Sequence, residues 1–137
     1  MRGAKDPPPG FAVRSANTSV DLTFFEGMAP EAQARWIHAH DVIVSPHGAQ
    51  LSNLVFARPC TAVVEIFEAG KYLTFYGTLT LAVGGVHFVA TTSRRRRLPS
   101  RDATVGAEAS VVAAALPCAL EARRECLRAR ANATLIL

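Results

Sequence analysis

Residues 41–56 read DVIVSPHGAQLSNLVF and residues 62–67 read AVVEIF, and these two stretches decide the fold. Each holds a run of apolar, mostly β-branched residues without polar alternation, at Val42–Val44 and at Ala62–Phe67, where only Glu65 interrupts. Strands that are apolar on both sides are typical of parallel sheets covered by helices on both faces. Between them, Leu51 and Leu54 return to helical spacing. The two stretches therefore predict a strand at 42–45, a loop, a helix and a strand at 62–67.

The same alternation extends outward in both directions. A helix is expected from Pro30 to about Asp41, because proline suits the first helical turn and an apolar side chain recurs every three or four residues. Further elements are expected as a short strand at Val20–Phe25, a helix at Tyr72–Val83 and a strand at Val86–Ala90. Alternating strands and helices predict a Rossmann-like α/β fold with a parallel sheet and helices on both faces.

Composition limits the class of protein. The chain has 137 residues, of which 50% are hydrophobic and 19% charged, so it is long enough for one packed domain and is not typical of disorder. No apolar run approaches the roughly 20 residues of a membrane-spanning helix. The opening MRGAKDPPPG is not followed by an apolar block, so no signal peptide is expected in it.

The positive charge is concentrated in the last third of the chain. Residues 94–137 contain nine Arg and four acidic residues, whereas residues 1–93 are nearly neutral. The expected division is therefore a flexible lead-in at 1–19, an α/β region at 20–92, an Arg-rich linker at 93–106 and an Ala-rich helical tail at 107–137. The tail predicts one or two helices without an evident partner, one of them starting at Pro117.

Three cysteines are too few and too scattered for a disulfide scaffold or a four-ligand zinc site. In a helix, Cys118 and Cys126 lie about 12 Å apart along the axis. A disulfide needs Cα atoms within about 7 Å of each other. The two residues are therefore either helical or bonded to each other, and the pattern favours the helix.

Polar residues inside the α/β region lie where strands end. His47, Gly48 and Ala49 follow a strand and start a helix, which in open parallel sheets is the ligand-binding edge. The helix start presents free N–H groups to an anion, Asn53 lies one turn further, and Glu65 is placed to accept ribose hydroxyls. Each also has an ordinary structural interpretation as a surface, turn, capping or strand-edge residue.

Together these residues form a recognisable string. The H-G-A-x-L-S-N motif at 47–53, followed by V-V-E-I-F at 63–67, resembles the C-terminal part of glycosyltransferase family 61. The similarity extends upstream to FEGMAPEAQ at 25–33 and downstream to the strand around His87, covering roughly Asp21 to Ala90. Glu68 departs from the family, in which proline is common at that position.

The resemblance implies an inverting glycosyltransferase of the two-domain GT-B type, with a nucleotide-sugar donor such as a UDP-sugar. His47, Gly48 and Ala49 would approach the diphosphate, Asn53 would order the loop, and Glu65 would bind the ribose. No DxD-type motif is present in the matched region, so catalysis without a metal or cofactor is expected. The acceptor would be a glycan or glycoprotein, and the compartment the lumen of the Golgi or endoplasmic reticulum.

The catalytic base is not identified. The acceptor-binding half and the usual base are expected upstream, so the chain is expected to be a partial enzyme, with any membrane attachment through a segment outside it. His47 is a candidate base but is better explained as a donor contact. The sequons at Asn17 and Asn132 agree with a lumenal setting.

Two other functions stay open. The same pocket suits a non-catalytic nucleotide or nucleotide-sugar binding module. Arg94–Arg97 and Arg101 suit phosphates of nucleic acid, but no aromatic residue follows Thr92 to stack on bases, so a solvated linker is favoured and no nucleic-acid partner is expected.

Overall fold

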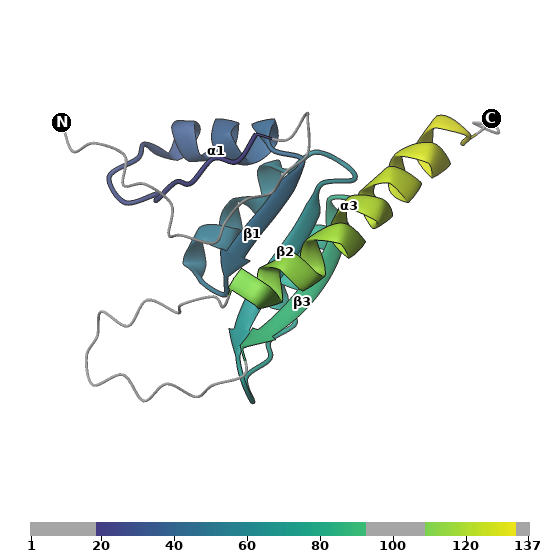
Figure 1. Ribbon diagram of the computed structural model, residues 1–137. Helices are drawn as coiled ribbons and strands as arrows, with labels where there is room; N and C mark the ends of the chain where they lie inside the picture. The colour runs from purple at the N-terminus through teal and green to yellow at the C-terminus, as the bar shows by residue number, and fades with distance from the viewer. Residues whose placement is uncertain (1–18, 93–108, 134–137) are drawn as a thin grey trace.

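The computed structural model describes residues 19–92 and 109–133, and its centre is a three-stranded parallel sheet (Figure 1). The strands are β1 (Val42–Pro46), β2 (Ala62–Glu68) and β3 (Val86–Thr92), in the spatial order β1-β2-β3. In the register, Ser45 lies opposite Glu65, and Glu65 lies opposite Val89. The predicted strands at 42–45, 62–67 and 86–90 and their parallel pairing are confirmed.

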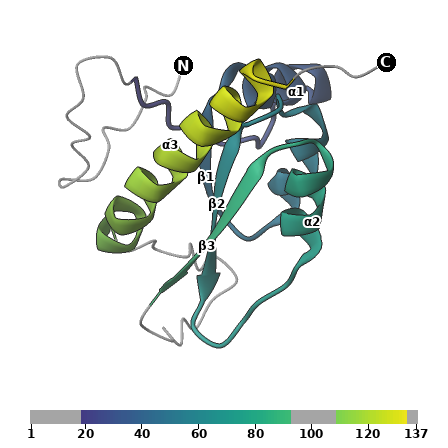
Figure 2. The ribbon, with the colours of Figure 1, turned by 90° about the vertical axis from the view of Figure 1, so that its right-hand side faces the viewer.

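Helices lie on both faces of the sheet, as expected. One face carries α1 (Pro30–Ala39), the 3-10 helix η1 (Ala49–Phe56) and α2 (Phe75–Ala82), and the other carries α3 (Ala109–Ala131) (Figure 2). Because β2 is central and covered on both sides, all of Ala62–Phe67 is buried, which explains its continuous apolar run. The edge strand β1 is less covered than predicted, since Val44 is exposed.

The first face has its own hydrophobic core. In the 3-10 helix η1, side chains three residues apart share a side, so Leu51 and Leu54 both point inward. They pack with Ile37, Ile43, Val63 and Tyr76. On α2, Tyr76 and Thr80 face inward, but the helix begins at Phe75 instead of the predicted Tyr72, and Leu73 is exposed before it.

The second face contradicts the expectation that the Ala-rich tail has no partner. Helix α3 packs Val112 and Ala119 against Val64, Ile66 and Ala90 of the sheet. The small side chain of alanine lets a helix approach a sheet closely while giving little hydrophobic signal in the sequence. The expectation that Pro117 starts this helix is also wrong, because α3 begins eight residues earlier and continues through it.

A disulfide joins the segment before β2 to helix α3. Cys60, just before β2, is bonded to Cys126 of α3 with a Cα–Cα distance of 5.6 Å. Residues 118–126 are helical, as favoured by the spacing argument, and Cys118 is free and exposed. The sequence argument weighed only Cys118 and Cys126, whereas the bonded pair is 66 residues apart in sequence.

One predicted strand is absent. Residues 20–25 form no regular element, with Val20, Leu22 and Phe24 exposed. Only Phe25 packs inward, edge-to-face on Trp36 with ring centroids 5.5 Å apart. A strand needs a neighbour for its N–H and C=O groups, and this segment pairs with no strand of the sheet. Within residues 19–92 and 109–133, no helix combines the length and apolar character needed to cross a membrane.

Candidate functional site

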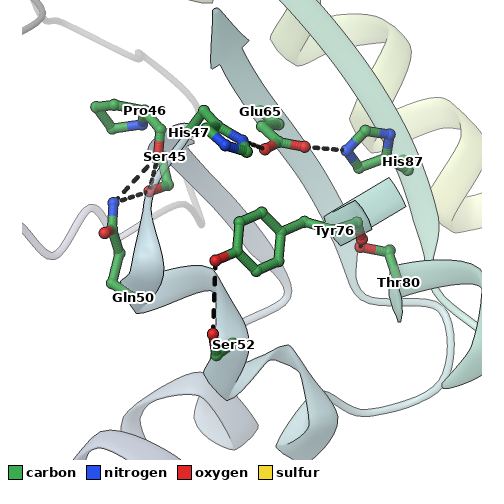
Figure 3. Close-up of polar contacts among 9 residues, drawn as sticks. All are labelled: Ser45, Pro46, His47, Gln50, Ser52, Glu65, Tyr76, Thr80 and His87. Carbon is green, nitrogen blue, oxygen red and sulfur yellow. Dashed lines mark hydrogen bonds and ion pairs between the residues drawn. The ribbon is translucent and has the colours of Figure 1, made fainter. Parts of the chain in front are cut away.

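Three ionisable side chains form a row across the sheet, from the loop after β1 through the middle of β2 to the second residue of β3. Glu65 of β2 lies between His47, which follows β1, and His87 of β3 (Figure 3). Its Oε1 is 2.5 Å from Nδ1 of His47, and its Oε2 is 2.9 Å from Nε2 of His87. An ionised carboxylate only accepts hydrogen bonds, so both rings donate to it. Every strand thus contributes to one hydrogen-bonded row, His47–Glu65–His87.

The centre of the row is more buried than its two ends. The side chain of Glu65 is 0% exposed, that of His87 is 10% exposed and that of His47 is 29% exposed. A buried carboxylate is costly unless its oxygens are hydrogen-bonded. The two histidines satisfy both oxygens, and only His47 presents a substantial surface to a ligand.

Glycine makes room for the inner histidine. A Cβ placed on Gly77 of α2 would come within 3.1 Å of Nδ1 and 3.2 Å of Cε1 of His87. The helix therefore lies so close to the ring that a side chain at this position would require a shift of a few tenths of an ångström. His87 is fixed from two sides, by Glu65 and by the α2 backbone.

Aromatic rings hold the outer histidine. His47 stacks on Phe67 with ring centroids 4.8 Å apart, and Tyr76 lies tilted against it at 5.3 Å. Its backbone N–H donates to the Ile66 carbonyl at 2.9 Å, so the loop is still attached to β2 at this point. With Nδ1 on Glu65, Nε2 has no hydrogen-bond partner among the described residues. It is the ring atom available to a ligand.

The loop after His47 is ordered by amide side chains. Gln50 donates from Nε2 to Ser45 Oγ at 3.0 Å and to the Pro46 carbonyl at 3.1 Å. Gly48 has an extended backbone, with φ 174°, and the three atoms nearest to a Cβ there all belong to the flexible end of Gln50. Glycine therefore matters at the start of η1 because it has no side chain, and not because of its backbone conformation. The first N–H groups of a helix lack acceptors within it and are free for other partners.

Asn53 is directed toward α1. It donates to Gln33 Oε1 at 2.9 Å, and Gln33 donates in turn to the Met28 carbonyl at 2.8 Å. Asn53 also donates to the Gln50 carbonyl at 3.2 Å. These contacts suit the loop-ordering role that the resemblance implies, and they join η1 to α1 and the turn before it.

The structure thus gathers some predicted site residues and separates others. His47, Gly48 and Glu65 lie together, Ala49 opens η1, and Asn53 bonds away from the row. The ribose contact of Glu65 stays a prediction, but the carboxylate is buried and already holds two histidines. His87 was not selected as a site residue from the sequence. The feature that could have identified His87 is that it is a polar residue within an apolar strand. That strand lies next to the one that carries Glu65.

Other predicted features lie partly outside the described residues. Arg94–Arg97, Arg101 and Asn17 are outside them, whereas Asn132 is exposed just after α3. Within the described part of the chain, no group of three or more His, Cys, Asp or Glu residues is arranged to hold a metal ion. Absence of a metal requirement stays a prediction.

Fold and site define a small parallel α/β unit whose polar row reaches the end of β1 at His47, on the edge where such sheets usually bind ligands. The family model Glycosyltransferase 61 matches residues 12–64 and confirms the family resemblance over somewhat less than half of the chain. It includes the H-G-A-x-L-S-N segment and ends one residue before Glu65. Neither the curated proteins nor the solved structures contain a match.

Proposed function

We propose that this chain is the donor-binding part of an inverting glycosyltransferase that uses a nucleotide sugar such as a UDP-sugar. The family match suggests glycosyltransferase activity. The observation that carries the donor role is His47, partly exposed at the end of β1 and held through Nδ1 by a buried carboxylate. The described unit would be the C-terminal half of a GT-B enzyme, with the acceptor-binding half outside these 137 residues.

The proposed chemistry is stabilisation of the leaving nucleoside diphosphate. Negative charge grows on the phosphate as the sugar–oxygen bond breaks, and a fixed donor stabilises it most at that stage. With Nδ1–H on Glu65, a protonated His47 directs its remaining N–H, on Nε2, outward. The free N–H groups at the start of η1 would add to this. Glu65 acts as a positioning residue, because it fixes which nitrogen of His47 faces the ligand.

The row is less suited to supply the catalytic base. Both oxygens of Glu65 bond to histidines, and its side chain is fully buried. Glu68, the next carboxylate on β2, pairs with Lys71 at 2.7 Å. We therefore assign the base to the acceptor-binding half, and the reaction needs no metal or other cofactor in this proposal. The acceptor is a glycan or glycoprotein.

The surroundings of the site support a facing half. Tyr72, Leu73 and Phe75 are exposed in and after the β2–α2 loop, and Tyr72 and Phe75 contact Phe67 and Tyr76, which pack against His47. Exposed apolar side chains beside a polar site are typical of surfaces that another domain covers. The disulfide agrees with the lumen of the secretory pathway, where such bonds persist.

Calorimetric titration with UDP tests the donor role. The folded chain should bind UDP with one site, and His47→Gln should weaken binding about tenfold, which corresponds to about 1.4 kcal/mol. His38→Gln is the matched control, because His38 contacts the Phe56 carbonyl rather than Glu65 and should leave UDP affinity unchanged. A well-folded chain that does not bind UDP or another nucleoside diphosphate would contradict the proposal.

A binding module without transfer activity is the second candidate, favoured by the engagement of both Glu65 oxygens. Incubation with UDP-sugars and a panel of glycan and glycopeptide acceptors separates the two, because any sugar transfer by the purified chain excludes the module. If the chain binds a UDP-sugar without transferring the sugar, and addition of the rest of the enzyme restores transfer, the result would support the donor-binding half.

A further inference from the structure

A second charged feature lies at the opposite end of the sheet from His47. A surface pocket of about 400 Å³ is lined by residues that precede β2, by His38 of α1 and by the last turns of α3. Its polar lining is mainly three arginines, Arg58, Arg123 and Arg130, and its other walls are Pro59, Thr61 and Leu127. We call it the arginine pocket. It shares no residue with the His47–Glu65–His87 row.

The positive charge of the arginine pocket is only partly balanced. Asp41 accepts from Nη2 of Arg58 at 2.8 Å and from Nη2 of Arg123 at 2.5 Å, through the same oxygen. Arg130 has no carboxylate partner among the described residues. Three guanidinium groups thus face one carboxylate, which leaves an excess of two positive charges before His38 is considered.

Donor groups in the pocket also exceed acceptors. The Nε atoms of Arg58 and Arg123 are buried and have no hydrogen-bond partner within the described part of the chain. Buried polar atoms are paired in the great majority of cases, and unpaired ones often mark a site for an ion or water. The side chains of Arg58 and Arg123 are 42% and 22% exposed, so their guanidinium groups stay accessible to an anion while the Nε atoms lack an acceptor among the described residues.

Helix α3 also carries two arginines that lie on the surface outside the arginine pocket. Arg124 and Arg128 both pair with Glu121 on α3, at 3.3 and 3.6 Å, and are largely exposed. Arg123 and Arg130 are turned instead toward the pocket. The two kinds of arginine offer matched variants within one helix.

The pocket is held together covalently. Cys60 lies between Pro59 and Thr61, and Cys126 precedes Leu127, so the disulfide joins the two walls. The wall formed by α3 cannot separate from the wall before β2 while this bond is intact. Its arginines therefore have a defined spacing in the folded chain, which anion recognition requires.

From these observations we infer that the arginine pocket binds a doubly charged phosphate or sulfate group. Guanidinium groups present planar pairs of N–H donors that match the oxygens of such anions, and they keep their charge at all physiological pH values. The excess of two charges fits a dianion. The inference is independent of the donor role, because the site lies at the other end of the sheet.

Titration with sodium phosphate and with sodium sulfate, at ionic strength held constant with NaCl and in the presence of saturating UDP, tests the inference. Saturable binding is expected for both anions, and Arg130→Gln should weaken it at least fivefold. Arg128→Gln should change it less than twofold. Non-saturable heats, or equal losses in the two variants, would overturn the proposal, whether or not UDP binds.

Amide NMR shifts give the location independently of the variants. Phosphate should shift the signals of Thr61, Arg123 and Leu127 while leaving that of His47 unchanged. Reduction of the disulfide in a chain that remains folded by circular dichroism should weaken phosphate binding, because the two walls are then free to separate. Shifts confined to His47 and its loop would assign the anion to the other end of the sheet and contradict the inference.

Discussion

At the scale of single residues, the position of Glu65 determines the character of the site. A carboxylate in the middle of a buried strand has no water to solvate it, and two histidines, one from the loop after β1 and one from β3, take that place. In this arrangement the buried carboxylate of Glu65 orients the ring of His47. The exposed imidazole is then a fixed group rather than a freely rotating surface side chain.

Glu65→Gln tests the orienting role with almost no change of volume. A glutamine amide has one oxygen and one NH₂ group, so it accepts from only one histidine and faces the other with a donor. We expect UDP affinity to fall about tenfold, or about 1.4 kcal/mol, and ¹⁵N spectra to show a changed tautomer of His47. Glu68→Gln, on the exposed pair with Lys71, should leave the His47 spectrum unchanged. An unaltered tautomer in Glu65→Gln would show that the carboxylate does not orient the ring.

Gly77→Ala tests the packing behind the row. Alanine favours a helix over glycine by about 1 kcal/mol. The added Cβ would lie 3.1 Å from the His87 ring, which its bond to Glu65 prevents from moving aside. Overpacking of this kind costs about 1–3 kcal/mol, so we expect a net decrease in the free energy of unfolding in urea. Thr78→Ala, at an exposed position of the same helix, should not show it.

At the scale of elements, α3 separates what the sequence predicts from what it does not. The strands and α1 follow from apolar runs and from Pro30, because those signals are local. The packing of α3 does not, because alanine is equally compatible with solvent and with a closely packed face. For the same reason the Cys60–Cys126 pair is not predictable, since it depends on where α3 lies on the sheet.

The site shows the same division. His47 and Glu65 are recognisable from their strand-end positions and motif, but the bonds between them require the register that places Ser45 opposite Glu65. His87 is recognisable only when β3 is known to lie beside β2. The local signal therefore predicts which residues meet a ligand better than it predicts which residues support them.

Pro117→Ala tests how α3 tolerates an interior proline. Proline removes one helix hydrogen bond and costs about 3 kcal/mol in a helix interior. Alanine also increases the entropy of the unfolded chain, which offsets about 1 kcal/mol. Since Pro117 is exposed, its replacement leaves no cavity, and the free energy of unfolding should rise by about 1–2 kcal/mol. An unchanged or lower value would mean that the proline aligns α3 on the sheet.

At the scale of the whole molecule, the disulfide connects the sheet to the helix that covers its second face. In a chain-entropy model, a bond closing a loop of this size contributes about 4 kcal/mol. The double variant Cys60→Ser with Cys126→Ser should lower the free energy of unfolding by about 2–4 kcal/mol in urea titrations. Cys118→Ser is the control and should have no effect, because Cys118 is free and exposed.

The two ends of the sheet carry different charge. The carboxyl end presents His47, the outer end of the histidine row, with exposed aromatic residues beside it, and the amino end holds the arginine pocket. A nucleotide and a dianion would therefore occupy the molecule at the same time without competing. Separate binding isotherms for UDP and phosphate, each unaffected by the other ligand, are the expected result.

The Cys60–Cys126 bond has a last consequence, for the way the chain responds to a protease. Residues 94–97 are all arginine and lie between the two bonded cysteines in sequence, so a cut by trypsin after any of them leaves two polypeptides joined by the disulfide. The nicked protein would run as one band on a gel without reductant and as two bands with it. After the cut, the backbone no longer connects α3 to the sheet. Whether α3 still covers the second face of the sheet then depends on the redox state of the disulfide.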